Sequence, residues 1–212
     1  MALGRTAFEP LNDYPEAKAF WWPRFDRIAR WFIDWELERR LNVQTVYAEV
    51  QGTLQITPDF MLTARADRIE QRSDGTFAVL DYKTGRPPSP KEVRVGFAPQ
   101  LTLQATILRH GSFEKVPTGG SVSELMYLRL NGGDPGGEKA PRDFESLTLD
   151  AAADAALKKL RELVVKFASE HEPYVSFWRP MWVGRTYGDY DHLARVREWS
   201  ATGGEIDPDI PA

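Results

Sequence analysis

Three side chains in the first half of the chain have the types and spacing for metal-dependent chemistry: Asp67, Asp81 and Lys83. Two carboxylates on one face of a sheet repel each other unless a cation lies between them. Carboxylate oxygens bind Mg²⁺ well, and bound Mg²⁺ polarises a phosphoryl group and acidifies a water that a nearby lysine can orient. The trio therefore fits phosphodiester hydrolysis, although a D-x-K pair alone is also common as a solvated salt bridge.

The segment 62–85 must position these side chains, and its sequence predicts a β-hairpin. Alternating and β-branched residues flank the turn residues Ser73-Asp74-Gly75. If these three residues form the loop, Asp67 lies opposite Asp81, and Lys83 shares the face of Asp81. With a two-residue loop, Asp67 would instead face the residue after Asp81, so the inference depends on the turn.

Two strings in this hairpin carry a family resemblance. A-R-A-D-R-I-E at 64–70 and V-L-D-Y-K-T-G at 79–85 resemble the G-R-x-D-x-I-D and D-Y-K-T-G motifs of RecB-family nucleases in the PD-(D/E)xK superfamily. Gln100 falls where that family has its Q-L-x-x-Y helix. The chain departs from the motifs at three positions that are not metal ligands: Ala64, Glu70 and Gln104.

The resemblance implies an α/β fold with a restriction-endonuclease-like PD-(D/E)xK core, in which helices flank a mixed central β-sheet. It also implies Mg²⁺ or Mn²⁺ held by Asp67, Asp81 and the carbonyl of Tyr82, with Lys83 supporting the attacking water. The expected reaction is hydrolysis of DNA by a Mg²⁺-dependent exodeoxyribonuclease.

Two further residues are candidates for the same site. By the resemblance, Gln100 contacts the substrate or the water network, but it also fits a polar residue in the first turn of a helix. Glu49 lies on an expected strand at 43–54, ahead of Asp67. It either approaches the metal or is a surface glutamate, and the sequence leaves both readings open.

A narrower resemblance, to the C-terminal nuclease domain of AddB-type helicase–nuclease subunits, rests on the segments 20–25 and 187–199. It implies single-stranded DNA fed by a helicase, a partner subunit of AddA type, and a role in double-strand break repair and recombination. The family places a metal-binding histidine upstream of the hairpin, whereas all three histidines here lie downstream. We therefore expect the chain to be a C-terminal piece of a larger parent protein.

Composition restricts cofactors and location. Some AddB-type domains hold an iron–sulfur cluster through cysteines, but this chain has no cysteine and cannot ligate one by thiolates. Its net charge of −4 argues weakly against a free-standing DNA binder, which is usually basic. No apolar run reaches membrane length and the first residues lack a signal-peptide pattern, so no membrane partner is expected and cytoplasmic residence is the default.

We expect three regions: a loosely ordered lead-in at 1–19, a nuclease core at 20–172, and an aromatic extension at 173–212 with a short helix and a frayed tail. The core should have strands near 43, 60, 76 and 123 and helices near 20, 99 and 150, with a mobile glycine-rich loop at 131–140. The helix at 20–41 carries an apolar stripe: Trp21, Phe25, Ile28, Phe32 and Trp35.

Two functions of other classes stay open. The domain could be a catalytically weak scaffold that docks a helicase subunit. It could also bind single-stranded DNA through Arg24, Arg27, Arg30 and the C-terminal aromatics. The arginines also fit a solvated helix face, and the aromatics also fit ordinary packing.

Overall fold

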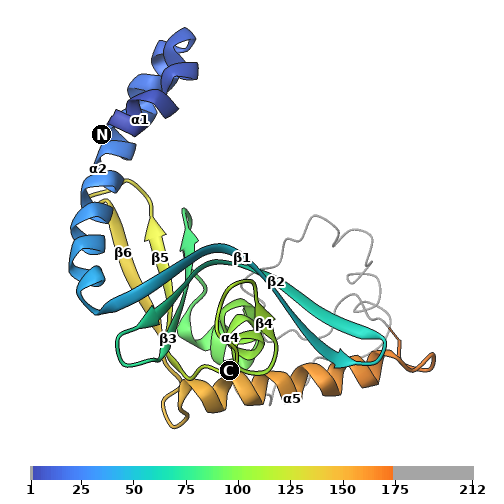
Figure 1. The fold of residues 1–212 in the computed structure, drawn as a ribbon. Coiled ribbons are helices and arrows are strands. Elements are labelled where there is room, and N and C mark those ends of the chain that lie inside the picture. Colours follow the sequence, from blue (N-terminus) through green and yellow to red (C-terminus); the bar gives the residue numbers. More distant parts are fainter. Residues whose placement is uncertain (1, 174–212) are drawn as a thin grey trace, which may run out of the picture. The chain divides into compact units, whose positions relative to one another are not determined.

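A six-stranded sheet forms the centre of the computed structural model, which describes residues 2–173 (Figure 1). The strand order is β4-β1-β2-β3-β5-β6; among these described strands the β3–β5 pair is parallel and the other pairs are antiparallel. The sheet is therefore mixed, and helices flank it, which confirms the predicted α/β class. The strands are β1 (Val43–Thr57), β2 (Phe60–Arg72), β3 (Phe77–Lys83), β4 (Ser112–Phe113), β5 (Val122–Leu130) and β6 (Gly137–Arg142).

The helices lie before, between and after these strands. They are α1 (Ala2–Ala7), α2 (Pro15–Arg39), α3 (Pro90–Val95), α4 (Gln100–His110) and α5 (Leu149–Phe167), with short 3-10 helices at Glu9–Asp13 and Arg40–Asn42. The chain divides after Val164 into two units, and the sheet belongs to the first. Within residues 2–173, no helix is long and apolar enough to cross a membrane. The expected helix at 191–199 and the C-terminal aromatics lie outside the described residues.

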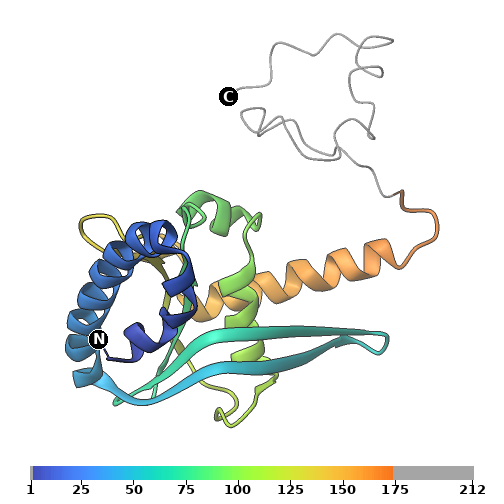
Figure 2. The same ribbon diagram turned by 90° about the horizontal axis from the view of Figure 1, so that it is seen from above.

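The β2–β3 hairpin has the register that a three-residue loop predicts. Arg68 pairs with Leu80, and Gln71 pairs with Phe77. Gly75 in the loop adopts a φ of 83°, a left-handed conformation that glycine reaches without steric cost. Beyond the hairpin, β1 and the first part of β2 continue as a long two-stranded ribbon (Figure 2).

Strand β3 is buried on both faces, because it begins with the continuous apolar run 77–80. On one face, Val79 belongs to the main core, which α4 closes with Leu101 and Leu108. On the other face, Leu80 packs in a smaller cluster with Trp35 of α2. The alternation of side chains along β3 therefore separates two environments, and the candidate site lies on the α4 side.

Helix α2 is fastened to the sheet by buried ion pairs around Glu70. Arg39 Nη2 of α2 lies 2.7 Å from Glu70 Oε2, and Arg68 Nε of β2 lies 2.7 Å from Glu70 Oε1. Arg39 also pairs with Glu124 of β5 at 2.6 Å. Both arginines lie beside the ring of Trp35. Glu70, which replaces the family's aspartate, thus faces α2 and not the predicted site.

The N-terminal residues differ from the expected loose lead-in at 1–19. They form α1, a 3-10 helix and the first turn of α2, because Phe8 packs against Trp22 and Phe25 with ring centroids 5.2 Å away in each case. Trp22 takes the inward position on this part of α2. Trp21, which the predicted stripe placed in the core, is instead 53% exposed.

The predicted mobile loop at 131–140 is partly a strand. Its second half forms β6 on the sheet edge, where Pro141 is tolerated because an edge strand need not donate on both sides. Its first half packs on α2, where Arg27 Nε donates to the carbonyl of Gly132 at 2.7 Å. A Cβ on Gly136 would lie 2.2 Å from the carbonyl oxygen of Arg27, so glycine is required there for close approach.

We expect Glu70→Ala to lower the free energy of unfolding by about 3–5 kcal/mol, because two partly buried guanidinium groups lose a shared counter-ion. Urea unfolding measures this value. The control is Glu162→Ala, which removes one exposed partner of an i,i+4 pair on α5 and should change stability by less than about 0.5 kcal/mol. Equal effects of the two variants would contradict the role given to Glu70.

Candidate active site

Asp81, Lys83 and Gln100 form a closed triangle of polar contacts at the end of β3. Lys83 Nζ lies 2.6 Å from Asp81 Oδ2 and donates a hydrogen bond to Gln100 Oε1 at 3.0 Å. Gln100 Nε2 in turn donates to Asp81 Oδ1. The structure thus brings together three of the residues that the sequence predicts, and Asp81 is almost completely buried among them.

Helix α4 places Gln100 in this triangle. The helix begins at Gln100, directly after Pro99, and its apolar stripe of Leu101, Ala105 and Leu108 is buried in the main core. One turn further on, Gln104 is also buried and donates to the carbonyl of Arg65 at 3.1 Å. Gln104, at the motif position where the family has tyrosine, therefore ties α4 to β2.

Asp67 reaches the same place from β2. The ladder of β2 with β3, continued by one pair, puts Asp67 opposite Asp81. Its Oδ2 accepts a hydrogen bond from the backbone N–H of Tyr82 at 2.9 Å, so the carboxylate lies over the end of β3. The two acids come from neighbouring antiparallel strands and converge, as the three-residue loop predicts.

Burial is the main cause of a raised pKa at Asp81. The Lys83 ammonium lowers this pKa again, the nearby charge of Asp67 raises it, and the Gln100 amide lowers it, so the net shift stays upward. The charged form of Asp81 is thus incompletely compensated by its protein neighbours. A divalent cation between the two acids would supply the missing compensation.

The donor set fits a hard divalent cation. Asp81 Oδ2 is buried and ion-paired with the Lys83 ammonium, so a divalent cation would take the place of that ammonium on this oxygen. Among residues 2–173, no group of three histidine, cysteine or acidic side chains could hold a metal ion together. Asp67, Asp81 and the carbonyl of Tyr82 would therefore share the cation with water, a mixture that suits Mg²⁺, which keeps several waters.

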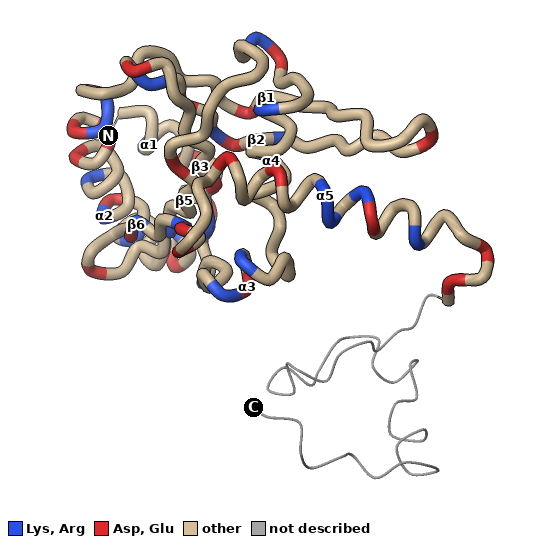
Figure 3. Tube along the Cα trace, turned by 90° about the horizontal axis from the view of Figure 1, so that it is seen from below, with Lys and Arg blue, Asp and Glu red and all other residues tan. Residues whose placement is uncertain are grey.

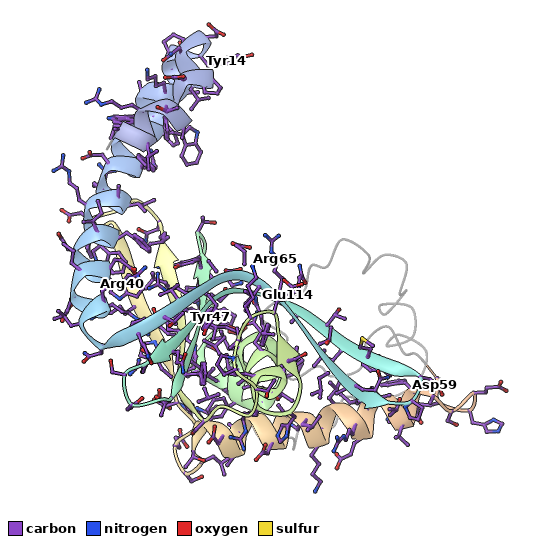
Figure 4. The ribbon with its side chains drawn as sticks, in the orientation of Figure 1. Tyr14, Arg40, Tyr47, Asp59, Arg65 and Glu114 are labelled. Carbon is purple, nitrogen blue, oxygen red and sulfur yellow. The ribbon has the colours of Figure 1, made fainter. Side chains whose placement is uncertain are left out.

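Glu49 is placed near Asp67 along the sheet but is not joined to the triangle. The backbone pairs on either side of it put Glu49 opposite Asp67 in the β1–β2 ladder. Its side chain instead pairs with Arg65 at 2.8 Å, with both side chains more than half exposed. Arg65 points outward from β2 (Figure 4). Glu49 has a φ of 55°, a conformation uncommon for a residue with a Cβ, and its catalytic role stays a prediction.

One residue next to the triangle was missed by the sequence analysis. Tyr127 pairs with Asp81 in the parallel β3–β5 ladder and is fully buried. The guanidinium of Arg142 lies 5.1 Å from the centre of its ring. The alternation at 123–130 predicts a strand, but no local signal gives its register against β3.

The three arginines considered for DNA binding on α2 each contact the protein. Arg30 pairs with Asp26 at 2.7 Å, Arg27 donates to the carbonyl of Gly132, and the guanidinium of Arg24 lies 3.7 Å from the ring centre of Phe20. Positive and negative residues are interspersed along this helix (Figure 3). Their assignment to phosphate binding stays a prediction.

Comparison of the chain with known proteins identifies a family to which it is similar. The model of the PD-(D/E)XK nuclease superfamily matches residues 5–179. An uncharacterized protein of Rickettsia conorii is 34% identical over 101 residues, which are 46% of this chain and 12% of that protein. An uncharacterized protein of Rickettsia bellii is 32% identical over 99 residues, again 12% of its length. The chain thus matches only a small part of these curated relatives.

The raised pKa of Asp81 predicts how stability depends on pH. Because the folded chain holds this proton more tightly than the unfolded chain, the contribution of Asp81 to stability is greatest below its ordinary pKa of 3.8. That contribution is lost as the pH rises through the folded-state pKa. We therefore expect metal-free Asp81→Asn to be more stable than the parent chain near pH 7, with the difference disappearing in acid.

Urea unfolding in a chelator at several pH values measures this difference. Asp59→Asn, at the exposed tip of the β1–β2 ribbon, is the control and should follow the parent at every pH (Figure 4). An Asp81→Asn chain that is less stable than the parent at pH 7 would show that Lys83 and Gln100 fully compensate the buried charge.

Proposed function

Because the chain belongs to the PD-(D/E)XK nuclease superfamily, we propose that it is a metal-dependent DNA nuclease domain whose site is the cluster of Asp67, Asp81, Lys83 and Gln100. The observation that carries the proposal is the buried Asp81, which contacts Lys83 and Gln100 while Asp67 converges from the neighbouring strand. Two acids and a lysine around one buried position are the groups that phosphodiester hydrolysis with a divalent metal needs.

Each residue has a distinct task in this proposal. Asp67, Asp81 and the carbonyl of Tyr82 hold Mg²⁺ or Mn²⁺, which when bound polarises the phosphoryl group and acidifies a water. Lys83 carries a positive charge at the site, where it orients the attacking water and stabilises the negative charge that develops on the phosphate. Gln100 fixes both partners, because its amide donates to Asp81 and accepts from Lys83.

The finer assignment is to an AddB-type nuclease domain. We propose that it acts as an exodeoxyribonuclease on single-stranded DNA delivered by a helicase subunit of AddA type, in double-strand break repair in the cytoplasm. The resemblance of the segments 20–25 and 187–199 supports this assignment. The low coverage of the relatives, 12% of their length, agrees with a domain that works within a longer parent protein.

Two substitutions separate metal binding from chemistry. We expect Asp81→Asn to lose saturable Mn²⁺ binding, because it removes a charged ligand. We expect Lys83→Met to keep Mn²⁺ binding but to lose DNA cleavage by a factor of about 10² or more, because it removes charge stabilisation in the reaction. Calorimetric titration with Mn²⁺ and a cleavage assay on end-labelled DNA measure the two effects.

The control for these variants is Lys158→Met, which changes a lysine on an exposed face of α5 and should preserve both properties. Mn²⁺ binding by Asp81→Asn at the parent's affinity would remove the site assignment. Cleavage by Lys83→Met at the parent's rate would point to a contaminating nuclease. Mn²⁺ binding by the parent chain without cleavage would favour the scaffold function over the enzyme.

The proposed substrate gives a further expectation. An exonuclease needs a free end, so linear single-stranded DNA should be cleaved while circular single strands remain intact. Because the proposed substrate is a single strand, blunt duplexes should also remain intact in the same assay. Gel analysis of the three substrates with Mg²⁺ measures this preference. Equal loss of the linear and circular strands would replace the exonuclease assignment by an endonuclease.

A further inference from the structure

Tyr127 lies beside the candidate metal ligand without any role in the function proposed above. Strands β3 and β5 are parallel, and their register pairs Asp81 with Tyr127. Paired residues of neighbouring strands project to the same face of a sheet. Tyr127 is fully buried on this face, among the side chains of the main core.

The hydroxyl of Tyr127 has no hydrogen-bond partner among the described residues, although it is buried. An unpaired buried hydroxyl costs free energy, so its presence calls for an explanation beyond packing. Burial, and after it the charge of Asp81, raises the pKa of Tyr127 to about 12. The hydroxyl therefore keeps its proton near neutral pH and remains a hydrogen-bond donor.

Two cations contact the ring of Tyr127. Lys83 Nζ lies 5.6 Å from the ring centre, and the guanidinium carbon of Arg142 lies 5.1 Å from it. Arg142 also donates to the carbonyl of Pro88 at 3.1 Å, so it fixes the loop that follows β3. The ring is thus held in place by Arg142 and lies next to the catalytic lysine.

Asp81 Oδ2 is the second buried atom at this point that lacks a well-aligned hydrogen bond. Among residues 2–173, the cation paired with this oxygen is the ammonium of Lys83 at 2.6 Å. A divalent cation on Asp81 would compete with that ammonium, because both neutralise the same carboxylate. The site therefore contains a buried acceptor, a buried donor on the adjacent strand, and a lysine that metal binding would displace.

We propose that Tyr127 is a positioning residue of the metal site: its hydroxyl donates a hydrogen bond to the Asp81 carboxylate when that carboxylate binds a divalent cation, and its ring retains Lys83 beside the site. This inference rests on the proposed nuclease function. Carboxylate ligands of metals are commonly oriented by such hydrogen bonds from outside the coordination sphere. The hydroxyl would then have a partner that none of the described residues supplies in the structure.

The test is Tyr127→Phe, which removes only the hydroxyl. We expect its Mn²⁺ dissociation constant to rise about tenfold, while its unfolding midpoint in a chelator equals or exceeds that of the parent chain. Calorimetric titration and urea unfolding measure the two quantities. The matched control is Tyr47→Phe, which removes a hydroxyl that donates to Gln71 on another part of the sheet and should leave the Mn²⁺ affinity unchanged.

The outcomes separate this inference from the function on which it rests. A Tyr127→Phe chain that binds Mn²⁺ as the parent does, while Asp81→Asn does not, overturns the role of Tyr127 alone. A Tyr127→Phe chain that is destabilised without metal, or that does not fold, shows that the hydroxyl has a structural role and also overturns it. A parent chain that binds no Mn²⁺ overturns both proposals.

Discussion

The burial of one carboxylate, Asp81, is the constraint on which the candidate site depends. A charged group at the end of a strand that is buried on both faces loses its hydration. Neighbouring cations and hydrogen-bond donors must compensate for this loss. Lys83 is on the same strand, Gln100 is at the start of the next long helix, and Asp67 is on the adjacent strand. Three elements of the core thus converge on a single side chain.

The two faces of the sheet divide the charged residues by function. On the α4 side, Asp81 keeps an incompletely compensated negative charge, and Asp67 lies beside it. On the α2 side, Glu70 is paired with Arg39 and Arg68 and ties a helix to the sheet. Because side chains alternate along β2, a slip of one residue in the hairpin would turn Asp67 toward α2 and Glu70 toward α4. The hairpin loop therefore determines the chemistry of the site as well as the fold.

Local signals in the sequence predicted the parts of the site that local structure determines. The turn at 73–75 gave the register of Asp67 against Asp81, and Pro99 marked the start of the helix that carries Gln100. The position of Tyr127 depends on the pairing of β5 with β3 across about 45 residues of chain, and nothing in either strand encodes that register. Likewise, β6 was hidden in a glycine-rich segment whose glycines serve contact with α2.

The partners of the buried charges differ between the Glu70 network and the Asp81 cluster. Around Glu70, both carboxylate oxygens meet guanidinium groups, and Arg68 also pairs with Glu36 of α2 at 2.8 Å. At Asp81, Oδ1 accepts from Gln100 and Oδ2 is ion-paired with Lys83, yet burial still raises the pKa of the carboxyl. The Tyr127 hydroxyl on the adjacent strand has no hydrogen-bond partner among the described residues, so burying this charge and this hydroxyl costs free energy. A fold selected only for stability would remove this cost by replacing both with apolar side chains. Their presence together is explained if a cation completes the site, because binding would then offset the free-energy cost of burying them.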